Sequence, residues 1–118
     1  MKFLVIARPG GPVHEPEPDH MLGILERFRV WMQEQISAGR VDSTSLLAEG
    51  GGGSVINADT AEELMDLLLG SPTGAMFRYE VHPLVNFEAG MERSIEALRE
   101  AHWGPNHAEH RAAVSAGR

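Results

Sequence analysis

The chain has 118 residues, of which 42% are hydrophobic, and it carries a formal net charge of -7. This length excludes separate cofactor and substrate domains, and the ten dispersed Lys and Arg residues argue against DNA or RNA as a partner, because polyanions are bound by clustered basic faces. The absence of cysteine excludes disulfides and thiol chemistry.

The first expected elements are a strand, a proline-rich loop and a helix. Residues 2–7 form a nearly continuous apolar run of strand length, typical of a central strand. Residues 8–19 hold four prolines and two glycines, which predict a loop. We expect Asp19 to cap a helix that ends at Gly39. One apolar stripe predicts its buried face: Met21, Leu25, Phe28, Met32 and Ile36, widened by Leu22, Ile24 and Trp31.

Four consecutive glycines, residues 50–53, separate two expected strands at 41–48 and 54–57. The run lacks the Gly-Lys-Ser/Thr ending of a phosphate-binding loop, and it precedes a strand instead of a helix. A hairpin turn with glycines continuing into the next strand is therefore our main interpretation. Space for a ligand beside this backbone is the alternative.

Thr60 and Glu63 predict the start of a second helix. The Thr60 side chain can accept from the backbone N–H of Glu63, whose carboxylate can reach back to the N–H of Thr60. We expect this helix to end at Gly70 and a fourth strand to span residues 75–81. The resulting order, βαββαβ, predicts an α+β fold of the ferredoxin-like type.

A third helix is expected after the fourth strand, with Met91, Ile95 and Leu98 on one face. We expect a single domain over residues 1–104 and a C-terminal tail over 105–118 that is mobile or ordered only against a partner. In this element order one sheet face has no helix to cover it. We therefore expect a homo-oligomer, a dimer or larger.

The location of the protein is predicted from what its sequence lacks. No run of 18 or more apolar residues is present, so no membrane span is expected. The N-terminal apolar stretch is too short for the core of a signal peptide and runs directly into Arg8 and Pro9. A soluble, cytoplasmic protein is the resulting expectation.

Histidines and carboxylates gather around the proline-rich loop. His14 and His20 flank it together with Glu15 and Glu17. A histidine beside carboxylates is a plausible proton shuttle, because its charge changes near neutral pH. An acidic, solvated loop is the alternative for both histidines.

The expected fourth strand alternates between two kinds of side chain. Phe77, Tyr79 and Val81 share one face, whereas Arg78, Glu80 and His82 share the other. The ionisable face would be exposed in a monomer, or would line an interface or a cavity in a dimer. The C-terminal histidines, His102, His107 and His110, do not assemble a four-ligand set, so no metal site is predicted.

Three segments of the chain resemble the muconolactone isomerase-like family: residues 52–64 (GGSVINADTAEEL), the leucine pair 67–68 and residues 78–81 (RYEV). The resemblance spans roughly residues 1–85. It implies a ferredoxin-like subunit of the dimeric α+β barrel superfamily, in which two or more subunits pack sheet against sheet. Members include cofactor-free isomerases, cofactor-independent monooxygenases and proteins of no known activity.

The chain departs from that family at two places. Its hairpin is made of glycines, and the middle of its first helix carries Phe28, Val30 and Trp31. In muconolactone isomerase the corresponding places hold His and Tyr side chains and a charged patch. The departures predict a more open and more apolar cavity, suited to a larger or flatter molecule.

These observations lead to two functional hypotheses. The first is a cofactor-free isomerase or cyclase that moves protons on a hydrophobic lactone, polyketide or aromatic molecule. His20 would be its general acid and base, Glu15 or Glu17 would tune His20, and Arg8 would stabilise negative charge. Substrate contacts are predicted from His14, Trp31, Tyr79 and His82. The second hypothesis is a non-catalytic small-molecule-binding or accessory module of the same fold.

Overall fold

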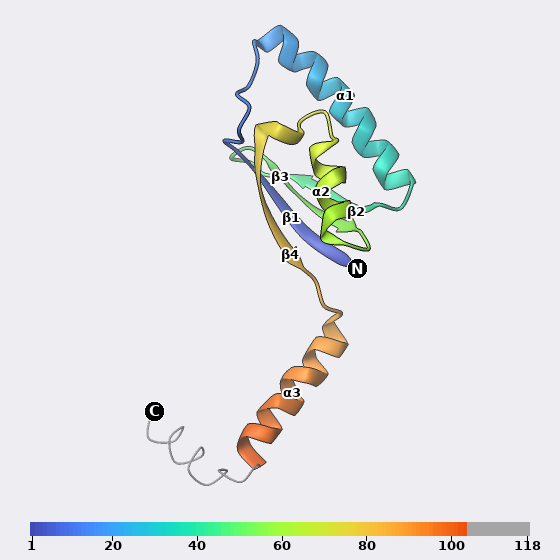
Figure 1. Ribbon diagram of the computed structural model, residues 1–118, viewed down its shortest axis with the longest axis vertical. Coiled ribbons are helices and arrows are strands. Elements are labelled where there is room, and N and C mark those ends of the chain that lie inside the picture. The colour runs from blue at the N-terminus through green and yellow to red at the C-terminus, as the bar shows by residue number, and fades with distance from the viewer. Residues whose placement is uncertain (104–118) are drawn as a thin grey trace. The chain divides into compact units, whose positions relative to one another are not determined.

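The computed structural model describes residues 1–103. In chain order its elements are β1 (Lys2–Pro9), α1 (Pro18–Ser37), β2 (Val41–Leu46), β3 (Gly52–Asn57), α2 (Ala61–Leu69), a short 3-10 turn (Gly74–Met76), β4 (Phe77–Pro83) and α3 (Phe87–Trp103). The chain divides after Leu84 into two compact units, the first holding the sheet with α1 and α2 and the second holding α3 (Figure 1). The predicted βαββαβ order and α+β class are confirmed.

The four strands form one antiparallel sheet in the order β2-β3-β1-β4. Its register sets which side chains share a face: Ala7 on β1 lies opposite Gly52 on β3 and Tyr79 on β4. Because successive side chains of a strand alternate, Ala7 and Tyr79 face one side of the sheet, and their neighbours Arg8 and Glu80 face the other.

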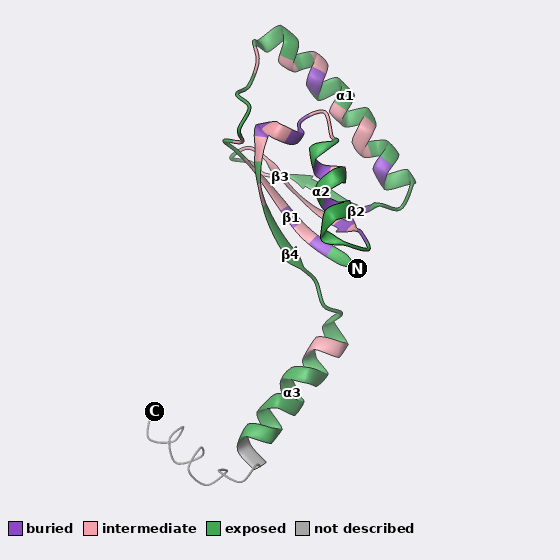
Figure 2. Cartoon of the chain, in the orientation of Figure 1, coloured by how far each residue is buried: buried purple, intermediate pink, exposed green. Residues whose placement is uncertain are grey.

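The hydrophobic core lies on one face of the sheet. Its buried residues come from the strands, from the end of β3 and from α2: Phe3, Val5, Val41, Ile56, Ala58, Leu64 and Leu68. Met32 of α1 packs against the same cluster. Both helices of the first unit therefore cover the same sheet face, and the buried positions concentrate there (Figure 2).

The opposite sheet face has no such cover within residues 1–84. Leu4 and Ile6 of β1 and Val55 of β3 point to that side and are half-buried. Ionisable side chains of β1 and β4 lie beside them. The open face predicted from the element order is thus present in this unit.

The glycine run forms the turn that was predicted. Gly50 and Gly51 have φ values of +106° and +84°, the left-handed region that favours glycine, whereas Gly52 and Gly53 belong to β3. The turn is closed by backbone hydrogen bonds from Gly50 N to Leu47 O (3.0 Å) and from Leu47 N to Gly51 O (2.9 Å). The hairpin interpretation is confirmed.

The first helix differs from prediction at its start and along its stripe. It begins at Pro18, and Glu17 occupies the N-cap position without a side-chain cap, so the predicted Asp19 cap is wrong. Proline suits the first turn because its fixed φ is helical and its missing N–H would have no partner there. Of the predicted stripe, only Ile24 is buried, whereas Leu25 and Ile36 are exposed.

Local details around the second helix also differ. The Thr60 side chain accepts from Glu63 N (3.1 Å) as predicted, but the Glu63 carboxylate accepts from the N–H of Asp59 (3.0 Å) instead of that of Thr60. The helix ends before Gly70, as predicted. The fourth strand does not begin at residue 75, because residues 74–76 form the 3-10 turn, in which Met76 N donates to Thr73 O (3.0 Å).

The second unit contains α3, whose apolar residues Met91, Ile95 and Leu98 are exposed. The boundary between the two compact units falls after Leu84. The single domain over residues 1–104 stays a prediction. The predicted tail over 105–118 lies outside the described residues. In the described part of the chain, no helix is both long and apolar enough to cross a membrane.

Candidate functional site

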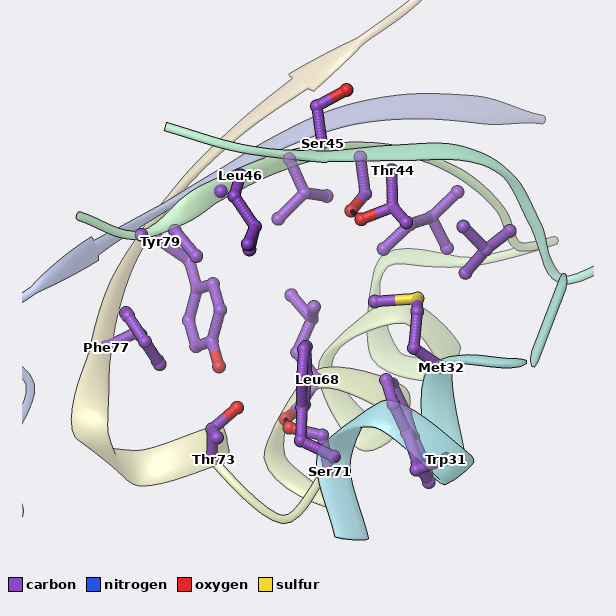
Figure 3. A pocket seen from close by; sticks show the side chains of 18 of the residues that line it. Trp31, Met32, Thr44, Ser45, Leu46, Leu68, Ser71, Thr73, Phe77 and Tyr79 are labelled. Atoms are coloured by element: carbon purple, nitrogen blue, oxygen red, sulfur yellow. Dashed lines mark hydrogen bonds between the residues drawn. The ribbon is translucent and has the colours of Figure 1, made fainter. Parts of the chain in front are cut away.

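A cavity of about 540 Å³ lies on the helix-covered face of the sheet, bounded by α1, by α2 and by the segment that joins α2 to β4. This volume falls in the range of small-molecule sites, roughly 300–1,000 Å³. Aromatic, aliphatic and hydroxyl side chains line it, and Figure 3 labels ten of them: Trp31, Met32, Thr44, Ser45, Leu46, Leu68, Ser71, Thr73, Phe77 and Tyr79. This cavity is the candidate functional site.

Small residues in the sheet keep part of the cavity open. Ala7 of β1 and Gly52 of β3 lie opposite each other, and both line the cavity. A Cβ at Gly52 would come within 2.8 Å of the backbone oxygen of Ser45, and one at Gly51 within 2.0 Å of the backbone oxygen of Ala7. Larger side chains are therefore excluded at this end of the hairpin.

Aromatic rings stand on two sides of the cavity. Trp31, with Met32, comes from α1, and Figure 3 shows them across the space from Phe77 and Tyr79 of β4. The Trp31 ring stacks on Phe28, one helical turn earlier, with 5.9 Å between ring centroids. Two opposed aromatic walls favour a flat apolar occupant, because rings gain from offset stacking beyond the area they bury.

A group of hydroxyls lies at one end of the cavity, on the segment before β4. Tyr79 donates from its phenol to the carbonyl of Gly74 at 2.8 Å, and Ser71 donates from Oγ to the carbonyl of Leu68 at 2.9 Å. Thr73, between them in sequence, is only 4% exposed. Its hydroxyl points into the cavity near the end of the Tyr79 ring (Figure 3). This end can therefore hydrogen-bond a polar group of an otherwise apolar molecule.

Burial controls the protonation of the Tyr79 phenol in the cavity. Desolvation raises the pKa of Tyr79 above its ordinary value, and the hydroxyl of Ser71 offsets part of that rise. The phenol consequently keeps its proton at neutral pH. Because this proton is donated to the Gly74 carbonyl, Tyr79 offers its oxygen to an occupant as an acceptor, and it is unsuited to act as a base.

A second pair of hydroxyls lies on the sheet side of the cavity. Thr44 of β2 and Ser54 of β3 are hydrogen-bonded to each other at 2.8 Å. Both residues line the cavity, opposite each other in the strand register. One of the two hydroxyl protons forms the hydrogen bond between Thr44 and Ser54. The other hydroxyl proton can be donated to a molecule in the cavity.

Ionisable groups are nearly excluded from the cavity wall. Among the described residues, the only ionisable side chain that lines it besides Tyr79 is Arg29, which is exposed on α1 and makes no ion pair there. Residues 1–103 contribute no carboxylate or imidazole to the lining. The arrangement therefore suits an uncharged occupant, because a charge buried without a partner is unfavourable.

The structure brings two of the seven predicted site residues into the cavity and leaves five of them elsewhere. Trp31 and Tyr79 line it. His14, Glu15 and His20 are exposed, and none of them lines the cavity. His20 lies in the first turn of α1, whereas the other two lie on the loop before it, whose first half is tied to the 3-10 segment by hydrogen bonds from residues 11 and 13.

Arg8 and His82 lie together on the open face of the sheet, away from the cavity. The Nε of Arg8 donates to Oε1 of Glu80 at 2.9 Å, and Nε2 of His82 lies 3.7 Å from Oε2 of the same carboxylate. The hydrogen bond from Arg8 is the main reason that the pKa of Glu80 is lowered. Arg78, on the same strand, donates weakly to the Pro9 carbonyl at 3.5 Å.

A metal centre would need several ligand side chains close together. Within the described part of the chain, no three His, Cys, Asp or Glu side chains come together as ligands. His107 and His110 lie outside that part, as does the side chain of His102. The described residues therefore contribute no candidate metal centre.

Sequence reasoning missed the hydroxyls of the cavity, Ser71 and Thr73 at one end and Thr44 and Ser54 on the sheet. For the strand pair the sequence did offer an indication. Ser54 lies two residues before the buried Ile56 on β3, and residues two apart on a strand face the same side of the sheet. For the segment before β4 the sequence offered only a Ser-Pro-Thr-Gly pattern, typical of any turn. Nothing local indicates that this turn closes a cavity.

Comparison of the sequence with protein-family models and with curated proteins finds no match. Solved structures do resemble the fold. A crystal structure of muconolactone isomerase is 21% identical in sequence, with a TM-score of 0.63, and the match covers 73% of this chain and 90% of the other.

The second similar structure is 5-chloro-2-hydroxyhydroquinone dehydrochlorinase from Burkholderia phenoliruptrix, in complex with 2,5-dihydroxybenzoquinone. It is 12% identical, with a TM-score of 0.52, and the match covers 75% of this chain and 98% of the other. Identities this low establish the shared fold alone. The ferredoxin-like fold predicted from the sequence is confirmed.

Proposed function

We propose that this protein binds a hydrophobic, ring-containing small molecule in the cavity between α1 and the sheet. One observation carries the proposal: an apolar cavity of about 540 Å³ has aromatic walls and a cluster of hydroxyls at one end. Each square ångström of apolar surface removed from water contributes roughly 25 cal/mol, so an apolar occupant gains most of its affinity from the walls. The hydroxyls then orient it.

The proposal is tested by NMR titration of the protein with naphthalene, a flat and uncharged probe. Binding in the cavity shifts the amide signals of residues along β1, β3 and β4 that face α1. Ala7→Leu extends a side chain into the cavity and is expected to weaken naphthalene binding by about 10-fold or more, because it removes space from the site. Ala48→Leu is the matched control, since Ala48 is exposed and does not line the cavity.

Two outcomes would contradict the proposal. One is the absence of any saturable shift at millimolar naphthalene. The other is equal binding to the protein with Ala7→Leu and to the protein with Ala48→Leu, which would place the probe elsewhere.

A second candidate function is cofactor-free catalysis, the isomerisation or cyclisation of a lactone, polyketide or aromatic molecule by proton transfer. Thr73 favours it, because a hydroxyl that points into an apolar cavity can donate to a developing oxyanion. Two solved structures of the same fold are an isomerase and a dehydrochlorinase, which fits such chemistry. His20, Glu15 and Arg8 remain the predicted set for proton transfer and charge stabilisation, although they lie outside the cavity wall.

In this function a homo-oligomer, a dimer or larger, would cover the open sheet face. Leu4, Ile6 and Val55 supply the apolar surface that a second sheet would bury. Arg8, Glu80 and His82 would then lie within or beside the interface between subunits. Whether these side chains can contact a ligand would depend on how the subunits pack.

A further inference from the structure

Among the described residues, the hydroxyl of Thr73 is the polar group of the cavity that is buried and lacks a protein partner. The residue is 4% exposed, and no hydrogen bond from or to its side chain is made within residues 1–103. Buried hydroxyls in proteins nearly always have a partner, because an unsatisfied one loses its bonds to water without replacement. A partner for Thr73 must therefore come from within the cavity.

The two hydroxyls beside Thr73 have already committed their protons. The phenol of Tyr79 donates to the Gly74 carbonyl, and the hydroxyl of Ser71 is shared between the Leu68 carbonyl and the Tyr79 oxygen, whose pKa it lowers. Burial raises the pKa of Tyr79, which keeps that proton in place. Both oxygens therefore face an occupant as acceptors, and of these three hydroxyls Thr73 alone has a free proton to donate.

This pattern of one free donor beside several acceptors matches a hydroxyl group. A ligand hydroxyl can accept from Thr73 while donating to the oxygen of Tyr79 or Ser71. An ether or a ketone satisfies only the donor of Thr73. A carboxylate places a negative charge against acceptor lone pairs, and the only cation that lines the cavity among the described residues, Arg29, is exposed on α1.

We infer that the occupant of this cavity is an uncharged phenol, enol or alcohol, and that Thr73 is the residue that selects its hydroxyl group. The inference rests on the proposed function, because it names the class of molecule that the same cavity binds. The ring of this molecule lies between Trp31 and Tyr79, and its hydroxyl lies at Thr73.

Four naphthalene compounds of similar shape test the inference on the unaltered protein: 2-naphthol, 2-methoxynaphthalene, naphthalene and 2-naphthoate. 2-Naphthol is expected to bind at least about 10-fold more tightly than the methoxy compound or naphthalene, because only it satisfies both the donor and the acceptors. 2-Naphthoate is expected to bind most weakly. Dissociation constants come from the NMR titration described above.

Two substitutions then assign the preference to Thr73. Thr73→Val keeps the shape of the side chain and removes its hydroxyl, so 2-naphthol should lose about 10-fold in affinity while naphthalene binding stays the same or improves. Thr73→Ser keeps the hydroxyl and should retain the preference for 2-naphthol. The folded state of each variant is checked by its thermal unfolding curve and its amide spectrum.

The outcomes separate this inference from the proposed function. If naphthalene binds in the cavity but 2-naphthol and 2-methoxynaphthalene bind equally, the selection of a hydroxyl is wrong and the cavity remains a binding site. If 2-naphthoate binds best, Arg29 decides the ligand class and the inference is overturned. If no compound binds, the proposed function itself fails. Should Thr73→Val not fold, the four compounds on the unaltered protein still decide the question.

Discussion

The phenol of Tyr79 on β4 donates to the backbone carbonyl of Gly74, five residues earlier, at 2.8 Å. This bond joins the first residues of β4 to the 3-10 turn before them, and it places Tyr79, Ser71 and Thr73 at one end of the cavity. Gly74 is buried, so its carbonyl has no access to bulk water in place of the phenol. One side chain therefore stabilises the turn and presents an acceptor to the cavity.

Tyr79→Phe is expected to lower the free energy of unfolding by about 1–3 kcal/mol, because it leaves the buried Gly74 carbonyl without a partner. Chemical denaturation measures the change. Ser94→Ala is the control: it removes a hydroxyl bonded to the Gly90 carbonyl at 2.9 Å on exposed α3, and should change stability by no more than about 0.5 kcal/mol. Equal effects of the two substitutions would show that burial of the Gly74 carbonyl has no energetic weight.

The glycine run allows a matched test of the hairpin. Gly51→Ala should destabilise by about 2 kcal/mol or more, since Gly51 has a φ of +84° and a Cβ there would meet the Ala7 carbonyl oxygen at 2.0 Å. Gly53→Ala should be neutral or slightly stabilising, because a Cβ added at Gly53 would meet no atom within 4 Å and the φ of that residue is ordinary. Urea unfolding of both proteins gives the comparison. A tolerated alanine at Gly51 would contradict the hairpin geometry.

Light scattering after size-exclusion chromatography tests the proposed oligomer. The unaltered protein is expected to elute as a dimer or larger at micromolar concentration. Ile6→Glu places a charge on the open sheet face and should reduce the oligomer, because a charge buried between two sheets is unfavourable. Leu22→Glu, at an exposed position of α1, is the control and should leave the elution unchanged. A folded monomer of the unaltered protein would refute the oligomer.

The pKa of Glu80 should depend on Arg8 and not on Arg78. The hydrogen bond from Arg8 lowers that pKa below its ordinary value of 4.5. The ionised Glu80 carboxylate thus stabilises the folded state at pH values above 4.5, and this stabilisation is lost as the pH falls below 4.5 and through the lowered pKa of the folded state. In an NMR titration, Arg8→Gln should move the pKa of Glu80 back toward 4.5, whereas Arg78→Gln should leave it nearly unchanged.

His20→Gln tests the catalytic candidate directly. It nearly keeps the size of the side chain, and it should reduce any turnover by roughly 100-fold or more if His20 transfers protons, as is typical of a general acid or base. The assay is substrate consumption in a panel of lactones and hydroxylated aromatic molecules. Full activity of this variant would remove His20 from the mechanism and direct attention to His82 with Glu80.

The sequence was sufficient wherever the deciding interaction is local. Thr60 caps α2 through a hydrogen bond three residues away, and Gly39, with a φ of +78°, follows the end of α1. Gly50 and Gly51 reverse the chain by their own backbone freedom. Such signals lie within a few residues, so composition and spacing reveal them, and together they predicted the order of elements.

The cavity was decided only by tertiary structure. Pairing of Ala7 with Tyr79 places both on the helix side and directs Arg8 toward Glu80 on the open face; a slip of one residue would exchange the two faces. Trp31 of α1 and Tyr79 of β4 line the same cavity because α1 packs on that face of the sheet. Strand register and long-range hydrogen bonds depend on the whole fold, whereas turns and caps depend on their immediate neighbours.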